Sequence, residues 1–170
     1  MELDYGRDAA FPENLTGYPG IILGYFGGPR AFNVWSKPQW MMFPRNYKIP
    51  IWVGGLGGLT EASDAIKALK ALGVPQGCVI LLDMETRIDK TYVEHFGIAM
   101  HGAGYKVWVY GSTGTLFNNP QCNGYAVADP TGAPHMYPHP GVRMTQYAFG
   151  PEYDNDVIRR WVITQDNLWR

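Results

Sequence analysis

The stretch Val79-Ile80-Leu81-Leu82-Asp83-Met84-Glu85 decides the fold and locates the candidate chemistry. It begins with a continuous apolar run, Val79–Leu82, which is typical of a strand buried on both faces. Asp83 and Glu85 follow two residues apart, and in an extended chain this spacing puts both side chains on one face, about 6.6–7 Å apart along the backbone. The stretch therefore predicts a buried central strand that ends in a pair of carboxylates.

The regions on both sides of this strand alternate between apolar β-rich runs and segments of helical period. A helix is predicted from Glu61 to Leu72, with Gly73 as its stop, and a second helix follows Asp89. This alternation is typical of parallel strands joined by crossover helices. The candidate strands are Glu2–Tyr5, Gly20–Tyr25, Ile49–Gly54, Cys78–Asp83, Lys106–Gly111, Gly124–Asp129, Arg143–Ala148 and Tyr153–Ile158. Eight strands in one domain indicate closure into a barrel.

The connections change character after Asn119. A short helix is predicted over Thr113–Phe117, whereas Pro38 leaves the stretch Asn33–Phe43 ambiguous. Beyond Asn119 the connections are rich in proline and leave too little room for amphipathic helices. The sequence therefore predicts an α/β fold, a TIM-like barrel with five β/α units followed by three strands joined by loops. With 170 residues, 46% of them apolar, we expect a single domain over 1–170 that buries its own core.

Composition and charge exclude several classes of function. The formal net charge is -1 and only 17% of the residues are charged, so no long-range field draws in nucleic acid or an anionic membrane. No apolar run approaches the ~20 residues of a membrane span, and the N-terminus lacks the features of an export signal. Aromatic residues reach 14%, which suits either sugar-binding surfaces or an aromatic core with a protein interface.

The sequence carries no motif for a metal, a phosphate group or acyl transfer. His135 and His139 flank a proline-rich loop in which no helix holds them on one face, and the two cysteines form no metal-binding pattern. The glycine clusters after the second and third strands lack the spacing of a phosphate loop, and no Ser or Cys stands in a nucleophile elbow. We therefore expect no metal site, no phosphate loop and no acyl-transfer site.

Polar side chains collect at the predicted strand ends. In a β/α barrel the reactive residues come from the carboxyl ends of several strands, because the loops there form a cup. Asp4 and Asp154 suit N-caps or loop anchors equally well, and Tyr110 and Gln146 could instead satisfy neighbouring backbone groups. The candidate residues are Glu85 and Asp83 for catalysis and Asp4, Tyr25, Tyr110, Asp129, Gln146 and Asp154 for substrate binding.

Two adjacent carboxylates fit the hydrolysis of a glycosidic bond. One carboxyl group must keep a proton for the leaving oxygen, and a second group must stabilise positive charge or assist the nucleophile. Because neighbouring carboxylates raise each other's proton affinity, the pair can supply the protonated acid. A solvated strand end or a helix N-cap produces the same Asp-x-Glu pattern, but the buried strand before Asp83 favours the catalytic interpretation.

Several short motifs follow one another in the order of a known family. They are Leu3-Asp4, Leu82-Asp83-Met84-Glu85, Val109-Tyr110-Gly111-Ser112, Val127-Ala128-Asp129, Thr145-Gln146-Tyr147 and Tyr153-Asp154. By these motifs nearly the whole chain resembles the Chalaropsis-type lysozymes, glycoside hydrolase family 25, and more closely the glycoside-hydrolase-like barrel domain of actinobacterial proteins and phage tail proteins. The resemblance implies five β/α units plus three strands, and neither a metal nor an organic cofactor.

The resemblance also implies roles, partners and a location. Glu85 would be the acid, Asp83 its partner carboxylate, and Asp4 and Asp154 further acidic residues of the cleft. The implied partner is a bacterial cell-wall glycan, peptidoglycan, with other virion tail proteins as further partners and with neither nucleic acid nor membrane. The implied location is extracellular or virion-associated.

Three departures from the lysozyme pattern define an alternative function. Ile51-Trp52-Val53-Gly54 stands where the lysozymes usually carry a Tyr-His-Phe motif, and Tyr25-Phe26-Gly27 stands where they usually carry an acidic residue after the second strand. Ala126 stands where their sixth strand usually presents a Trp. The sequence predicts a peptidoglycan hydrolase that uses the Asp83/Glu85 pair. The alternative is a non-catalytic glycan-binding or structural module of a phage tail or a bacterial surface protein.

Overall fold

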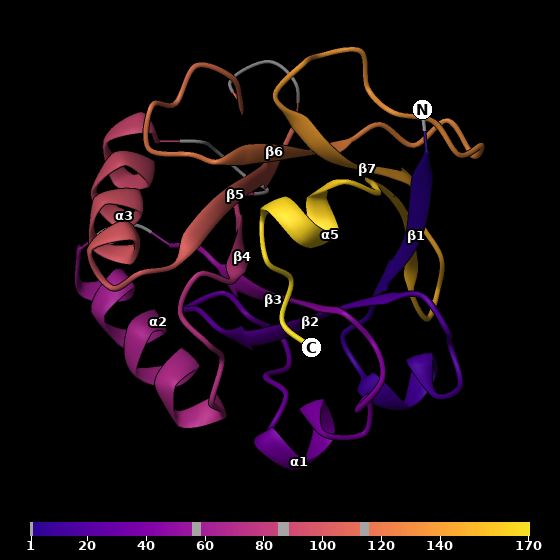
Figure 1. Ribbon diagram of the computed structural model, residues 1–170, viewed down its shortest axis with the longest axis horizontal. Helices are drawn as coiled ribbons and strands as arrows, with labels where there is room; N and C mark the ends of the chain where they lie inside the picture. The colour runs from indigo at the N-terminus through magenta and orange to yellow at the C-terminus, as the bar shows by residue number, and fades with distance from the viewer. Residues whose placement is uncertain (1, 56–58, 85–88, 113–115) are drawn as a thin grey trace.

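The computed structural model describes residues 2–55, 59–84, 89–112 and 116–170. In these residues eight strands form a closed barrel, in the order in which they follow along the chain (Figure 1). The strands are β1 (Leu3–Asp8), β2 (Ile21–Gly27), β3 (Lys48–Val53), β4 (Val79–Asp83), β5 (Lys106–Gly111), β6 (Gly124–Ala128), β7 (Val142–Ala148) and β8 (Asp154–Arg159). The predicted α/β barrel is therefore confirmed.

The direction of the strands decides which residues meet at each end of the barrel. β1 to β7 run parallel, so their carboxyl ends lie together. β8 runs antiparallel to both of its neighbours, β7 and β1. The first residue of β8, Asp154, consequently pairs with the last residue of β1, Asp8, at the carboxyl end of the barrel.

The helices lie in the connections between the strands and after β8. They are η1 (Pro12–Leu15), α1 (Lys37–Trp40), α2 (Leu59–Leu72), α3 (Lys90–Gly102) and α5 (Val162–Gln165). α2 and α3 pack on one side of the barrel, away from β1 and β7 (Figure 1). The helix predicted over Thr113–Phe117 includes residues outside the described ranges, so the count of five β/α units stays a prediction. In the described part of the chain, no helix is long and apolar enough to span a membrane.

Local sequence explains where the two long helices begin and end. Asp89 precedes α3, and its carboxylate accepts from the backbone N–H groups of Thr91 at 2.9 Å and Tyr92 at 3.2 Å. Gly73 follows α2 with φ +84°, a left-handed conformation that glycine adopts without strain. Its N–H donates to the carbonyl of Leu69 at 3.0 Å. These two helices agree with the sequence prediction.

Apolar side chains fill both faces of the central strands. Leu81 packs inside the barrel, whereas Leu82 packs outside it against the layer of helices. Because successive strand residues point to opposite faces, the run Val79–Leu82 has to be apolar throughout. The interior of the barrel is filled mainly by Ile21, Leu23, Ile49, Ile51, Val79, Trp108, Met144 and Ile158.

The segment after β8 closes the amino end of the barrel. In Figure 1, α5 lies within the ring of strands, and the chain then continues toward β3. Asp166 accepts from the indole N–H of buried Trp108 at 3.2 Å, and the backbone N–H of Lys48 donates to the carbonyl of Trp169 at 2.6 Å. In the described part of the chain, the amino end of the barrel is thus covered, and the carboxyl end can receive a ligand inside the ring.

Candidate active site

A small cavity, which we call the cup, opens at the carboxyl end of the barrel. Its volume is about 60 Å³, and its walls come from the ends of β1 to β5, β7 and β8 and from Phe149. It is lined by Asp8, Tyr25, Ile51, Leu81, Asp83, Tyr110, Met144, Gln146, Phe149 and Asp154. The structure thus brings together the predicted site residues Tyr25, Asp83, Tyr110, Gln146 and Asp154.

Strand alternation explains why these side chains converge. Asp83 lies two residues after Leu81, and Gln146 lies two residues after Met144. Leu81 and Met144 pack inside the barrel. Since residues two apart in a strand share a face, Asp83 and Gln146 also point inward, at the open end.

The first strand places Asp8 in the cup instead of Asp4. The prediction that Asp4 ends this strand is wrong, because β1 continues to Asp8. Asp4 lies near the amino end of the barrel, where its Oδ1 atom accepts from Nε of Arg160 at 3.2 Å. Asp8, which is buried, is not among the residues predicted from the sequence, although the spacing of Asp4, Gly6 and Asp8 puts all three on one strand face.

Gln146 holds two acidic side chains of the cup in place. Its Nε2 atom donates to Oδ2 of Asp8 at 3.0 Å and to Oδ2 of Asp154 at 3.1 Å. Its Oε1 atom accepts a hydrogen bond from the hydroxyl of Tyr110. Gln146 is only 4% exposed, so a neutral amide shielded from solvent bridges carboxylates from β1 and β8. Hydrogen bonds to charged acceptors are strong, and they fix the positions of both carboxylates.

The fourth strand supplies Asp83, as predicted. Asp83 is the last residue of β4 and is buried, and its carbonyl accepts from the N–H of Gly54 at 2.8 Å. The N–H of Met84 donates to the carbonyl of Tyr110 at 3.1 Å. Glu85, the predicted acid, lies outside the described residues. Its role therefore stays a prediction.

Burial favours the protonated form of two carboxyl groups on β8. Asp156 is fully buried, and neither of its oxygens has a hydrogen-bond partner among the described residues. Burial, and after it the charges of Asp8 and Asp154, raises the pKa of Asp156 well above its usual range. Burial also raises the pKa of Asp154. The N–H of Gly150, which donates to Oδ1 of Asp154 at 2.9 Å, lowers this pKa by a smaller amount. Within the described ranges no group of three or more Asp, Glu, His or Cys is placed to hold a metal ion.

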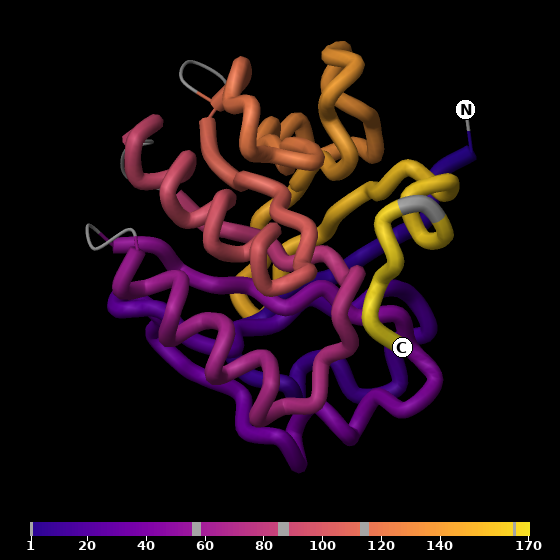
Figure 2. The backbone as a smooth tube through the Cα atoms, turned by 60° about the vertical axis from the view of Figure 1, so that its left-hand side comes forward, coloured from indigo at the N-terminus to yellow at the C-terminus, as the bar shows by residue number. Residues whose placement is uncertain are grey.

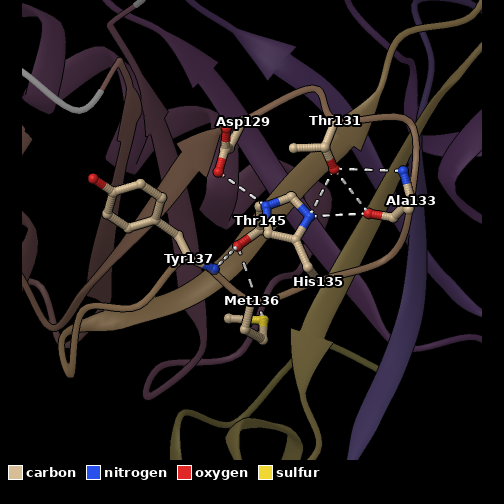
Figure 3. A network of polar contacts seen from close by, with 7 residues as sticks. All are labelled: Asp129, Thr131, Ala133, His135, Met136, Tyr137 and Thr145. Carbon is tan, nitrogen blue, oxygen red and sulfur yellow. Dashed lines mark hydrogen bonds and ion pairs between the residues drawn. The ribbon is translucent and has the colours of Figure 1, made fainter.

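Asp129 belongs to the loop between β6 and β7. β6 ends at Ala128, and Asp129 shares the strand face of Val127, which packs outside the barrel. Its Oδ2 atom lies 2.9 Å from Nε2 of His135 (Figure 3). Contrary to the prediction, Asp129 does not line the cup; its side chain anchors the loop.

Thr131, His135 and Asp129 are arranged like a nucleophile, base and acid, but their hydrogen bonds exclude that chemistry. Nδ1 of His135 lies 3.0 Å from the hydroxyl of Thr131 and 2.9 Å from the carbonyl oxygen of Ala133 (Figure 3). A carbonyl only accepts, so Nδ1 carries a hydrogen, while Nε2 donates to Asp129. The Ala133 carbonyl and then Asp129 raise the pKa of His135. With a hydrogen on Nδ1, His135 presents no lone pair to Thr131 and cannot take its proton. The hydroxyl of Thr131 donates instead to the carbonyl of Ala133 at 3.2 Å.

Exposed aromatic rings stand at the same end of the barrel as the cup. Phe149 lines the cup and is 59% exposed. Phe11 and Phe32 follow β1 and β2, and their rings meet edge to face with centroids 6.3 Å apart. Phe32 is 87% exposed. Some of the many aromatic residues in the sequence are therefore exposed at this end of the barrel, where their rings can contact a ligand.

The fold and the cup together define a class: a closed α/β barrel with acidic side chains at the carboxyl end of its strands. No family model and no curated protein matches the sequence.

Solved structures share the fold at low sequence identity. An uncharacterized protein of B. stearothermophilus has a TM-score of 0.77 and 16% identity, and the match covers 97% of this chain and 99% of that chain. The catalytic domain of endolysin ply40, from a bacteriophage of Listeria monocytogenes, has a TM-score of 0.67 and 13% identity, over 98% of each chain. The modular autolysin LytC of Streptococcus pneumoniae, solved with a synthetic peptidoglycan ligand, has a TM-score of 0.71 and 13% identity, over 93% of this chain and 47% of that chain. At these identities the similarity establishes the fold alone.

Proposed function

We propose that this protein is a glycoside hydrolase that cleaves the glycan strands of bacterial cell walls. The observation that carries the proposal is the meeting of aspartates from β1, β4 and β8 in one cup. Active sites of β/α barrels lie at this end, and the hydrolysis of glycosidic bonds uses paired carboxyl groups. The fold shared with an endolysin catalytic domain and with an autolysin solved with a peptidoglycan ligand supports the choice of substrate.

Glu85 and Asp83 carry out the central step in this proposal. Glu85 donates a proton to the bridging oxygen as the bond from that oxygen to the anomeric carbon breaks. Asp83 stabilises the positive charge that develops on the sugar ring. One water molecule adds to the anomeric carbon and gives up a proton to a carboxylate, which restores the acid. Atoms and charge balance with no further reactant.

The remaining cup residues position the substrate. Asp8 and Asp154, held by Gln146, are the other acidic residues of the cleft. Tyr25 and Tyr110 contact hydroxyl or N-acetyl groups of the sugar. We propose the arrangement of a family 25 lysozyme, five β/α units followed by three strands, and a site of action outside the cell or on a virion.

The experiment that tests the proposal measures reducing ends released from purified peptidoglycan. Glu85→Gln and Asp83→Asn are each expected to lower the rate at which reducing ends are released by at least about a hundredfold and to leave the fold intact, because each removes a group that acts on the scissile bond. Asp64→Asn, on the outer surface of α2, is the control and should keep full release. Equal release by wild type and by Glu85→Gln would exclude the mechanism.

A comparison of two variants on one strand tests the position of the cup. Asp8→Asn changes a residue that lines the cup, whereas Asp4→Asn changes one near the opposite end of the same strand. We expect Asp8→Asn to lower release and Asp4→Asn to lower it much less. The reverse order would place the reacting centre elsewhere.

The second candidate function is a non-catalytic glycan-binding or structural module of a phage tail or bacterial surface protein. The small volume of the cup, about 60 Å³, favours it, because pockets that bury a ligand usually measure about 300–1,000 Å³. Both donor positions of Gln146 are also already used within the protein. Glycan binding that is unchanged in Glu85→Gln, without any release of reducing ends, would support this alternative.

A further inference from the structure

A second cavity, which we call the outer pocket, lies on the outside of the barrel. Its volume is about 600 Å³, ten times that of the cup and within the usual range for ligand pockets. The side chains used below are those of Tyr5, Arg7, Tyr18, Arg45, Tyr47 and Tyr147, all of which line it. Nothing in the proposed function uses this pocket.

The outer pocket lies beside β1, on the side of the barrel away from α2 and α3. Figure 1 shows these two helices across the barrel from β1, and the described connections between the last strands, β6 to β8, are loops. The tube view shows the segment after β8 passing close to β1 at the edge of this face (Figure 2). Tyr5 and Arg7 point outward, because Gly6 between them faces Leu23 and Ile158 in the interior.

Arg7 is held in a fixed position on this face. Its guanidinium lies over the ring of Tyr18 at 4.4 Å and over the ring of Tyr153 at 4.1 Å. Its Nε atom donates to Oδ1 of Asn155 at 3.2 Å, and its two Nη groups make no hydrogen bond with described residues. An arginine fixed in this way presents its remaining donors without losing further side-chain freedom on binding.

Arg45 adds a second positive charge to the outer pocket. It is exposed, and within the described part of the chain neither Arg45 nor Arg7 forms an ion pair. The chain as a whole is nearly neutral, with a formal net charge of -1. Asp4 also lines the outer pocket, but its carboxylate is paired with Arg160. The guanidinium groups of Arg7 and Arg45 have no acidic partner among the described residues, so they favour an anionic ligand.

The backbone of the outer pocket is rigid and tightly packed. The side-chain amide of Asn46 donates to the carbonyls of Tyr18 at 2.9 Å and of Gly20 at 2.7 Å. A Cβ atom at Gly20 would lie 2.5 Å from the carbonyl oxygen of Tyr5 and 2.6 Å from the hydroxyl of Tyr18. Only glycine therefore fits at position 20, and the hydrogen bonds of Asn46 tie together the two segments of the pocket wall.

We infer that the outer pocket binds an anionic saccharide, a sugar ring that carries a carboxylate or a phosphate group. The tyrosine rings offer flat apolar surfaces to the C–H faces of a sugar, and their hydroxyls reach its polar edge. The parallel N–H donors of arginine match the two oxygens of a carboxylate or phosphate group. A neutral sugar has no such pair of anionic oxygens. The inference does not depend on turnover in the cup.

The test is an NMR titration of the ¹⁵N-labelled protein with matched sugars. N-acetylmuramic acid and N-acetylglucosamine differ by a carboxylate-bearing lactyl group, and glucose 6-phosphate and glucose differ by a phosphate. We expect at least one acidic sugar to shift the amide of Gly20 and to bind at least about tenfold more tightly than its neutral counterpart. The acidic arm that binds identifies the group recognised.

Variants separate the outer pocket from other surfaces. Arg45→Gln changes an exposed side chain and is expected to weaken the acidic sugar about tenfold, and Arg7→Lys, which keeps the charge but loses the planar fork, should do the same. Lys67→Gln, which removes an exposed charge from α2, should leave the affinity unchanged. Absence of binding, equal affinity for acidic and neutral sugars, shifts without any change at Gly20, or unchanged affinity in Arg45→Gln would each overturn the inference.

Discussion

Replacing Asp156 by asparagine is expected to make the protein more stable at neutral pH. Asp156 is fully buried, and neither of its oxygens has a hydrogen-bond partner among the described residues. Burial, together with the charges of Asp8 and Asp154, raises its pKa, so the folded protein keeps a proton that the unfolded chain has already released. Asparagine has nearly the same shape and cannot ionise, so the variant avoids this cost.

Proton linkage sets the size of the effect. An aspartate in an unfolded chain titrates near pH ~3.9, and a difference of one bound proton changes the free energy of unfolding by about 1.4 kcal/mol per pH unit. The folded state binds the extra proton. The free energy of unfolding of wild type therefore falls by about 1.4 kcal/mol for each pH unit above pH ~3.9, until the pH reaches the pKa of Asp156 in the folded protein. The advantage of Asp156→Asn therefore grows with pH at this slope and then levels off. For a domain of this size, each kcal/mol corresponds to roughly 2–4 °C in Tm.

Urea unfolding followed by tryptophan fluorescence, at about pH 4, 5, 6 and 7, measures this difference. Asp64→Asn is the matched control, because Asp64 lies exposed on α2 beside Lys67. Its stability should run parallel to that of wild type across the series. A difference between Asp156→Asn and wild type that does not change with pH would refute the reasoning, as would a variant less stable than wild type at pH 7.

Three further predictions concern single side chains. Gln146→Leu removes the donor between buried Asp8 and half-buried Asp154, and we expect a loss of about 2–4 kcal/mol in the free energy of unfolding, measured by urea titration; an unchanged midpoint would contradict the bridging role. Below pH ~6.5, wild type should be more stable than His135→Asn, because protonated His135 is stabilised in the folded protein. This difference in stability should disappear as the pH rises through the raised pKa of His135, and thermal melts at several pH values measure it. Tyr92→Phe removes a buried hydroxyl that donates to Glu61 at 2.5 Å. In a urea titration this change should lower the free energy of unfolding by about 1–3 kcal/mol, and an unchanged value would mean that the hydrogen bond does not stabilise the fold.

The strand pattern could be predicted where both faces of a strand are apolar. Lys106–Gly111 was predicted with the bounds that β5 has, and β4 differs from the prediction by one residue. In these strands the continuous apolar run is itself the signal. The carboxyl-end positions of Asp83 and Tyr110 followed directly, because the last inward residue of a parallel strand must face the open end.

The sequence is less informative where strands carry polar residues. β1 reads Leu-Asp-Tyr-Gly-Arg-Asp, without an apolar run, so the sequence predicts its end three residues too early, at Tyr5, and does not indicate Asp8 as a site residue. The sequence predicts Asp129 at the end of a strand that faces the cup. Asp129 lies three residues after inward-facing Ala126, so its side chain is on the opposite face and points away from the cup. Asp156 gave no signal at all, because its burial depends on strands that lie far away in the sequence. The outer pocket likewise forms from segments that are brought together only when the barrel closes.

The pairing of β1 with β8 affects how the chain can fold during its synthesis. All six residues of β1, Leu3–Asp8, pair with β8, the last of the eight strands to be made. At about 5–20 residues per second, on the order of ten seconds separates the emergence of these two strands from the ribosome. Throughout that interval one edge of β1 presents unpaired backbone N–H and C=O groups to other nascent chains. The barrel closes only after its last strand has been made, and until then the growing chain depends on dilution or on chaperones to stay unaggregated.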